Sequence, residues 1–141
     1  MTRRDPIEFL ETFGSIKRAF SALAAGAYVE AEIGSTQAKF IRVIGTRSKI
    51  SQAELARATS TDPALTGRAL ESLIERGWVR RERSEEDRRE YVLELSATGK
   101  RAQQRVEKLR AELADKVVAV LDDRDMEDFQ RVANKIVAAF G

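Results

Sequence analysis

Apolar residues recur every three or four positions along most of the chain, which is the spacing of an amphipathic helix. The first such segment runs from residue 5 to residue 33, with Asp5 as its cap and Pro6 at the first helical position. Ser35 can cap a second helix, which we expect to end at Gly45. The pattern therefore predicts two helices in the first third of the chain.

The same spacing returns near the C-terminal end. Ser96 is the predicted cap of a long helix that reaches about Leu121, and Asp122 or Asp123 caps a last helix. The long helix carries a near-heptad seam, which is typical of a helix that packs along another helix.

The apolar stripes of the first and last helices are too broad to be covered within one chain of 141 residues. We therefore expect a homodimer that forms through both chain ends. The expected dimerisation residues are Ile7, Leu10, Val117, Met126, Phe129, Val132, Ile136 and Phe140.

Between these helical ends, residues 51–98 follow the order helix, turn, helix, strand, charged loop, strand. Ser51 and Glu54 have the spacing of a capping box, which begins a short helix. Hydroxyl side chains at residues 59–61 then compete with helical hydrogen bonds and favour a turn. Asp62 can cap the next helix, with Pro63 at its first position.

This second helix has one apolar stripe and one face of mostly small residues. The stripe that we expect to be buried consists of Leu65, Ala69, Leu70, Leu73 and Ile74. The face that we expect to be exposed consists of Pro63, Ala64, Thr66, Gly67 and Arg68. Because most of these residues are small, the helix backbone can come close to a binding partner.

A hairpin follows the second helix. Gly77 ends that helix by allowing a left-handed backbone, and an extended segment begins at Trp78. Five arginines lie between residues 80 and 89, and alternating apolar residues then predict a returning strand from Tyr91 to Leu95. Two strands that follow a helix-turn-helix and are joined by a charged tip make a winged helix. The predicted fold is mainly α with a small β-hairpin wing, flanked by N- and C-terminal dimerisation helices.

Residues 51–99 resemble the MarR-type transcriptional regulators. The wing signature of that family appears here as Asp87-Arg88-Arg89, followed by Val92, Leu93, Leu95-Ser96 and Gly99. Its helix-ending pattern appears as Leu73 to Val79 with Gly77 in place. This sequence departs from the family at Ser96, where threonine is usual, and at Gly67, where a larger polar residue is more common.

The resemblance implies a homodimeric repressor. Its recognition helices would enter successive major grooves, its wings would reach the flanking minor grooves, and a ligand that changes the spacing of the two lobes would release it. The implied division of the chain is an N-terminal dimerisation helix at residues 1–34, a DNA-binding lobe at 35–99 and C-terminal dimerisation helices at 100–141.

Composition excludes several kinds of site. The chain has 43% hydrophobic and 34% charged residues, as expected for one soluble globular domain. It contains no cysteine and no histidine, so zinc fingers, thiol switches and Cys- or His-dependent nucleophiles cannot be built. We therefore expect no catalytic residues, metal or cofactor. The apolar run at residues 22–29 is too short to span a bilayer, and we expect a cytoplasmic protein.

Without a thiol to oxidise, a bound small molecule is a better hypothesis for control than peroxide sensing. A lipophilic anion is the first candidate, on the resemblance alone. Phe13, Phe20 and Phe40 are candidates for a ligand pocket, although a place in the core is the favoured interpretation for these aromatic residues.

The net charge is only +2, but basic residues are concentrated in the middle of the chain. Residues 35–110 contain 17 basic and 11 acidic side chains, against 4 and 5 in residues 1–34 and 4 and 7 in residues 111–141. This distribution is expected when the middle faces phosphates and the ends face another protein.

The candidate DNA-contacting residues lie on the second helix, its preceding turn and the wing. They are Ser51, Thr61, Pro63, Ala64, Thr66, Gly67, Arg68, Arg88 and Arg89, with Asp87 expected to orient Arg89. A solvated charged hairpin is the simpler interpretation of the wing arginines, but their place directly after a helix-turn-helix favours contact with double-stranded DNA. The alternative function is a winged helix that docks an acidic protein partner. Salt dependence and a requirement for one defined duplex would separate the two.

Overall fold

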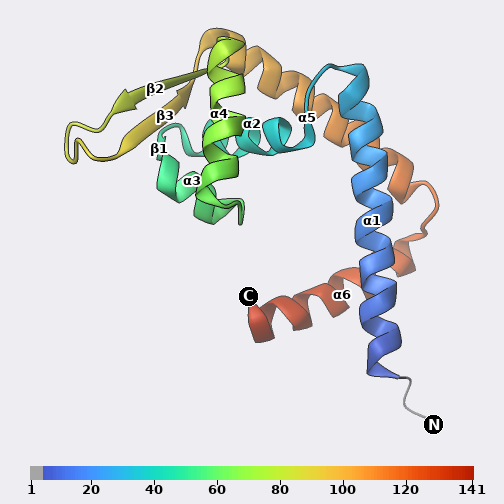
Figure 1. Cartoon of the computed structure of the whole chain (residues 1–141). Helices are drawn as coiled ribbons and strands as arrows, with labels where there is room; N and C mark the ends of the chain where they lie inside the picture. Colours follow the sequence, from blue (N-terminus) through green and yellow to red (C-terminus); the bar gives the residue numbers. More distant parts are fainter. Residues whose placement is uncertain (1–4) are drawn as a thin grey trace. The chain divides into compact units, whose positions relative to one another are not determined.

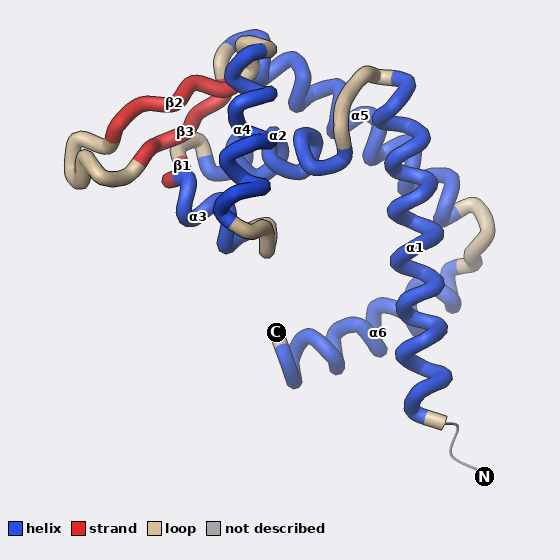
Figure 2. Tube along the Cα trace, viewed as in Figure 1, coloured by secondary structure: helices blue, strands red, loops and turns tan. Residues whose placement is uncertain are grey.

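The computed structural model describes residues 5–141, and within them it contains six helices and one antiparallel sheet of three strands (Figures 1 and 2). The helices are α1 (Pro6–Glu30), α2 (Ser35–Arg47), α3 (Gln52–Ala58), α4 (Pro63–Glu75), α5 (Ala97–Val118) and α6 (Asp123–Phe140). The strands are β1 (Ile50–Ser51), β2 (Val79–Arg83) and β3 (Tyr91–Leu95), in the spatial order β1-β3-β2. The chain divides into two compact units, the first ending at Leu109, and α5 belongs to both. The predicted fold class, mainly α with a small β-hairpin wing, is confirmed.

Local capping explains where most of these helices begin. The Asp5 carboxylate accepts a hydrogen bond from the Ile7 N–H at 2.9 Å and starts α1. Asp62 accepts from the Leu65 N–H at 2.9 Å at the start of α4. The hydroxyl of Ser96 and the carboxylate of Asp122 perform the same role for α5 and α6. These predicted helix starts are confirmed, with Asp122 rather than Asp123 as the last cap.

Helix α2 differs from its prediction at both ends. Gly34 is the N-cap, and its N–H donates to the side-chain oxygen of Gln37 at 3.1 Å, so that Ser35 is the first helical residue. The helix continues through Gly45 to Arg47. A Cβ at position 45 would overlap the side chain of Gln103 in α5. Gly45 therefore lies inside the helix, against the flexible end of that side chain, and does not end the helix.

Strand β1 was not predicted. Ile50 and Ser51 pair with Leu93 and Val92 of β3, which places a third strand beside the wing hairpin. Ser51 also caps α3, because its hydroxyl accepts a hydrogen bond from the Glu54 N–H at 3.1 Å. The Ser51 half of the predicted capping box is confirmed. A strand of two residues is too short to show an alternating pattern, so it leaves no signal in the sequence.

The buried face of α4 is rotated from its predicted position. Thr66, Leu70 and Leu73 are fully buried, whereas Leu65 is 39% exposed. The spacing from Thr66 to Leu70 to Leu73 follows one face of a helix, and Leu65 lies off that face. Burial of Thr66 is possible because its hydroxyl donates to the Asp62 carbonyl at 2.9 Å. The predictions that Leu65 is buried and that Thr66 is exposed are both wrong.

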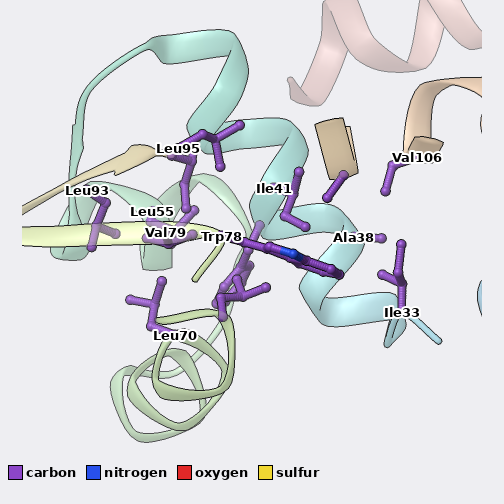
Figure 3. Packing of buried hydrophobic residues seen from close by; sticks show 14 of the residues in the cluster. Ile33, Ala38, Ile41, Leu55, Leu70, Trp78, Val79, Leu93, Leu95 and Val106 are labelled. Carbon is purple, nitrogen blue, oxygen red and sulfur yellow. The ribbon is translucent and has the colours of Figure 1, made fainter. Parts of the chain in front are cut away.

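The core of the first unit lies where α2, α3, α4 and the sheet meet the first half of α5. Its largest fully buried side chains include Phe40, Ile41, Ile44, Leu55 and Leu93. Figure 3 shows Trp78 lying across the middle of this cluster, toward Ala38 of α2. Burial of these apolar side chains is the main favourable contribution to folding of the lobe.

The first two-thirds of α1 and the whole of α6 expose apolar side chains. Seven of the expected dimerisation residues are exposed, namely Ile7, Leu10, Met126, Phe129, Val132, Ile136 and Phe140, and Val117 is half-buried. Helix α6 has no buried residue at all. Phe13 and Phe20 are also exposed, so their assignment to the core is wrong, whereas Phe40 is confirmed as a core residue and is closed to any ligand. Within residues 5–141, none of the helices combines the length and the apolar character needed to cross a membrane.

The first turn of α5 lies very close to the backbone of Trp78, and this contact allows the packing of the first unit to be tested. A Cβ on Gly99 would overlap the Trp78 carbonyl oxygen and lie 2.9 Å from the carbonyl carbon. Because backbone must then move, we expect Gly99→Ala to lower the free energy of unfolding by about 1–3 kcal/mol. Urea denaturation at one fixed protein concentration measures this change.

Gly67→Ala is the matched control. A Cβ at Gly67 would meet only the flexible end of the Gln52 side chain, at 4.0 Å. We expect this variant to be as stable as the wild type or about 0.5–1 kcal/mol more stable, because glycine inside a helix is unfavourable. A Gly99→Ala protein with wild-type stability would contradict the close approach.

Candidate nucleic-acid interface

The turn between α3 and α4 fixes the direction in which α4 starts. The Thr59 hydroxyl donates to the Leu55 carbonyl at 2.7 Å and lies 2.9 Å from the Thr61 hydroxyl. Ser60 adopts a left-handed backbone with φ of 50°, which turns the chain sharply. The Asp62 cap follows directly, so local bonds hold the exposed start of α4 against α3.

The predicted contact residues of this region differ in their exposure. Pro63, Ala64 and Arg68 are exposed, and Thr61 and Gly67 are half-buried. Ser51 and Thr66 are buried, and their hydroxyls already bond to the backbone of α3 and α4. These two residues are therefore structural, and their expected place on the outer surface is corrected.

A concave surface lies between α3, the start of α4 and the wing, and the space inside it has a volume of about 690 Å³. It brings Thr61, Pro63 and Thr66 together with Arg89, although Arg89 lies more than twenty positions further along the chain. The other predicted contacts, Ala64, Gly67, Arg68, Arg88 and Ser51, do not line it.

The concave surface also has residues that the sequence analysis missed. They include Gln52 and Arg57 of α3 and Tyr91 of β3. The helical spacing of Gln52, Ala53, Ala56 and Arg57 places two pairs four residues apart, and this pattern could have identified an exposed face of α3.

The wing loop at residues 84–90 is held by its own hydrogen bonds. The Ser84 N–H donates to the Glu90 carbonyl at 2.9 Å, and the Glu90 N–H donates to the Asp87 carbonyl at 3.0 Å. The Ser84 hydroxyl accepts from the N–H groups of Glu86 and Asp87, each at 3.2 Å. Figure 2 shows this loop at the far end of the two long strands. The wing tip is therefore ordered by the protein alone.

Three of the wing arginines contact other protein groups. Arg80 pairs with Glu94 at 3.4 Å, and Arg81 pairs with Glu71 of α4 at 2.8 Å. The third, Arg83, donates to the Arg88 carbonyl at 2.6 Å and to the Tyr91 hydroxyl at 3.2 Å. The guanidinium groups of Arg81 and Arg83 each lie 4.8 Å from the centre of the Tyr91 ring, within cation–π range.

The last two arginines of the wing, Arg88 and Arg89, are exposed. The Asp87 carboxylate accepts from the Arg89 backbone N–H at 3.0 Å, from Nε at 3.1 Å and from Nη2 at 3.4 Å. The side chain of Arg89 is nevertheless 91% exposed. Asp87 therefore fixes the direction of a guanidinium that remains open to a partner.

The same contacts change the protonation of Asp87. The hydrogen bond from the Arg89 side chain, followed by the one from its backbone N–H, holds the pKa of the Asp87 carboxyl below its ordinary value of 3.8. Since a lowered pKa keeps the carboxylate ionised, the pair is intact at neutral pH and is lost only as pH falls through that pKa.

The part of the chain that the structure describes contains no candidate metal-binding site. None of its His, Cys, Asp and Glu side chains gather in groups of three or more that could hold a metal ion. The exposed start of α4 and the ordered basic wing are instead suited to an extended anionic partner.

Comparison with known proteins identifies the family. Residues 33–90 match the model of the MarR family. The HTH-type transcriptional regulator BilQ of Clostridium symbiosum (strain WAL-14163) is 30% identical over 97 residues, which are 69% of this chain and 67% of that protein.

Solved structures of the same fold cover nearly the whole chain. Wild-type apo MarR from E. coli superposes with a TM-score of 0.83 at 20% identity, over 96% of this chain and 98% of that one. A MarR transcriptional regulator from Methanosarcina mazei Go1 gives 0.80 at 25% identity, over 94% and 96%. A mutant of E. coli MarR complexed with operator DNA gives 0.78 at 20% identity, over 94% and 99%. On the sequence relationship and the winged-helix fold together, this chain belongs to the MarR family of DNA-binding transcriptional regulators.

Proposed function

We propose that this MarR-family regulator is a homodimeric repressor that binds an inverted-repeat operator and is released by a small molecule. The observation that carries the proposal is Arg89, a 91% exposed guanidinium held in one direction by Asp87 at the tip of an ordered wing. A guanidinium that is oriented before binding suits a narrow minor groove, where the negative potential is strongest over A·T-rich sequence.

The exposed start of α4 supports a place in the major groove beside the wing. Pro63 and Ala64 have short side chains and Gly67 has none, so the helix backbone can approach the DNA closely. Arg68 is exposed on the next turn and can reach a phosphate or a base edge. Binding to DNA would also place the protein in the compartment that holds the DNA, the cytoplasm.

The alternative is that the same surface docks an acidic protein. The fixed direction of Arg89 favours DNA, because an acidic protein surface does not require one particular orientation of one guanidinium. A strong dependence of affinity on salt combined with preference for one duplex would support the operator, and equal affinity for all duplexes would support the alternative.

The homodimer is proposed from the exposed apolar side chains of the terminal segments, residues 1–34 and 100–141. Phe129 is 59% and Phe140 88% exposed on α6, and Leu10 is 61% exposed on α1. Monomeric soluble proteins rarely expose so many large apolar side chains, and a second copy of the chain would cover them.

Small-molecule control is proposed because no cysteine is present to act as a redox sensor. A lipophilic anion remains the first candidate, on the resemblance to the family alone. Titration of such an anion into the protein–DNA complex would show release of the duplex, and release by dilute peroxide with Met126 unmodified would argue against this form of control.

Selection of bound duplexes from a random pool tests the function and returns the site. A two-fold dimer should select an inverted repeat with half-site centres about 10 to 10.5 base pairs apart, one turn of the double helix. Recovery of single half-sites bound by monomer would overturn the proposed symmetry, and recovery of no preferred sequence would overturn the operator.

Replacement of Val132 and Ile136 by Asp tests the dimer. Both side chains are partly exposed on α6, at 38% and 39%, so charge there is tolerated in a monomer. In a dimer interface, an unpaired buried charge would cost several kcal/mol. Sedimentation should show monomer or unfolded chain, and an unchanged dimer would place the interface elsewhere.

Substitution of Arg89 tests the wing. Arg89→Ala should weaken operator binding by about 1–3 kcal/mol, more than loss of one unconstrained surface charge. Arg89→Lys should restore little, because an ammonium group cannot reproduce the planar fork of the guanidinium. Fluorescence anisotropy at fixed salt and neutral pH measures the affinity, with circular dichroism to show that the variants fold.

Arg124→Ala on α6 is the matched control, since it removes the same charge far from the wing along the chain. Asp87→Ala should give a smaller loss than Arg89→Ala, and the double variant should lose less than the sum of the two. Wild-type affinity in a folded Arg89→Ala protein would remove the wing from the DNA-binding surface.

A further inference from the structure

Gln52, the first residue of α3, has a buried polar atom without a partner. Its side-chain Oε1 is less than 1 Å² exposed, and none of the described residues donates a hydrogen bond to it. If the oxygen and nitrogen of the carboxamide exchange places, the nitrogen takes the buried position, so one polar atom is buried in either orientation. A buried acceptor without a donor costs free energy, so this position calls for an explanation.

The other end of the same carboxamide, the nitrogen, lies against α4. A Cβ built on Gly67 of α4 would be 4.0 Å from Gln52 Nε2, and that is its one neighbour within 4 Å among the described residues. The side chain of Gln52 therefore lies beside the position that a side chain at residue 67 would take, at ordinary van der Waals distance. Gln52 also lines the concave surface between α3, α4 and the wing.

The exposed start of α4 has few groups that could read a base. Pro63, Ala64 and Leu65 are exposed but apolar, and Thr66 is buried with its hydroxyl bonded to Asp62. Gly67 has no side chain. Until Arg68, then, this helix offers no exposed polar side chain to a base edge, and a base-reading group on this surface must come from a neighbouring element.

We propose that Gln52 is a specificity-determining residue that reads an adenine of the operator beside Gly67, where α4 has no side chain. This inference rests on the proposed operator binding. A glutamine carboxamide can bond an adenine edge at two points in the major groove, accepting from the N6 amino group and donating to N7. Rotation of the side chain toward the DNA would bring the unpartnered Oε1 out to the donor that it lacks.

The experiment is duplex selection followed by anisotropy on the selected operator and on each single-base variant of it. The variants are Gln52→Ala, the nearly isosteric Gln52→Glu, and Gln52→Ala combined with Gly67→Gln. Gln104→Ala, which removes an exposed carboxamide from α5, is the matched control. Circular dichroism shows that each protein folds.

We expect the wild type to require adenine at one position of each half-site. Gln52→Ala should accept any base there and bind the selected operator about 5- to 150-fold more weakly. Gln52→Glu should change the preference at that position to cytosine, whose N4 amino group donates to a carboxylate. The double variant should recover adenine, because its new carboxamide starts from position 67 beside the vacated space.

Three results would overturn the inference. Gln52→Ala with unchanged preference and affinity would show that Gln52 does not contact the operator. Uniformly weaker binding to every duplex, with the preference retained, would show a phosphate contact instead of base reading. If Gln52→Ala fails to fold, an unchanged preference in folded Gln52→Glu has the same meaning. A wild type that selects no sequence would instead overturn the proposed operator itself.

Discussion

The structure of the DNA-binding lobe depends on one junction, where the turn after α4 meets the first turn of α5. The Ser96 N–H donates to the Trp78 carbonyl at 3.0 Å, and the Ser96 hydroxyl donates to the Gly77 carbonyl while accepting from the Gly99 N–H. The approach is so close that Gly99 has no room for a Cβ, and Gly77 needs a left-handed backbone with φ of 73°. The end of α4, the base of both wing strands and the start of α5 are thus fixed together, which sets the direction of α4 relative to the wing.

Within the wing, hydrogen bonds and ring contacts decide what each arginine can do. Arg81 joins β2 to α4 through Glu71, and Arg83 closes the loop by donating to the Arg88 carbonyl. Their stacking on Tyr91 adds cation–π attraction at both positions. These internal contacts stiffen the hairpin, so that less conformational entropy is lost when Arg88 and Arg89 meet a partner. The arginines between residues 80 and 89 therefore both stabilise the hairpin and provide exposed side chains for contact with a partner.

Local interactions made much of this fold predictable, and long-range packing explains what was missed. Asp62 and Ser96 each cap a helix through bonds that span three residues, so the sequence alone identifies them. Which face of α4 is buried depends on Phe40, Leu55 and other residues far away in the chain, and the choice between Leu65 and Thr66 was consequently wrong. In the candidate site, the pairing of Asp87 with Arg89 could be predicted because the two residues are close together in the sequence. The close approach of Gln52 to Gly67 depends on how α3 packs against α4, so the sequence of neither helix predicts it.

The same junction limits how an effector could act. Since α4 and the wing are fixed to each other through Gly77, Trp78 and Gly99, they would move as one body. The lobe continues into α5 through buried Ala102 and Val106, and Arg105 donates to the Ala31 carbonyl at 3.1 Å, where α1 ends. A movement of α1 or of the first half of α5 would therefore reach the lobe through these contacts. In the proposed homodimer, a ligand would shift the equilibrium only as far as it prefers one spacing of the two lobes over another, and that preference would act on the proposed major-groove and minor-groove contacts together.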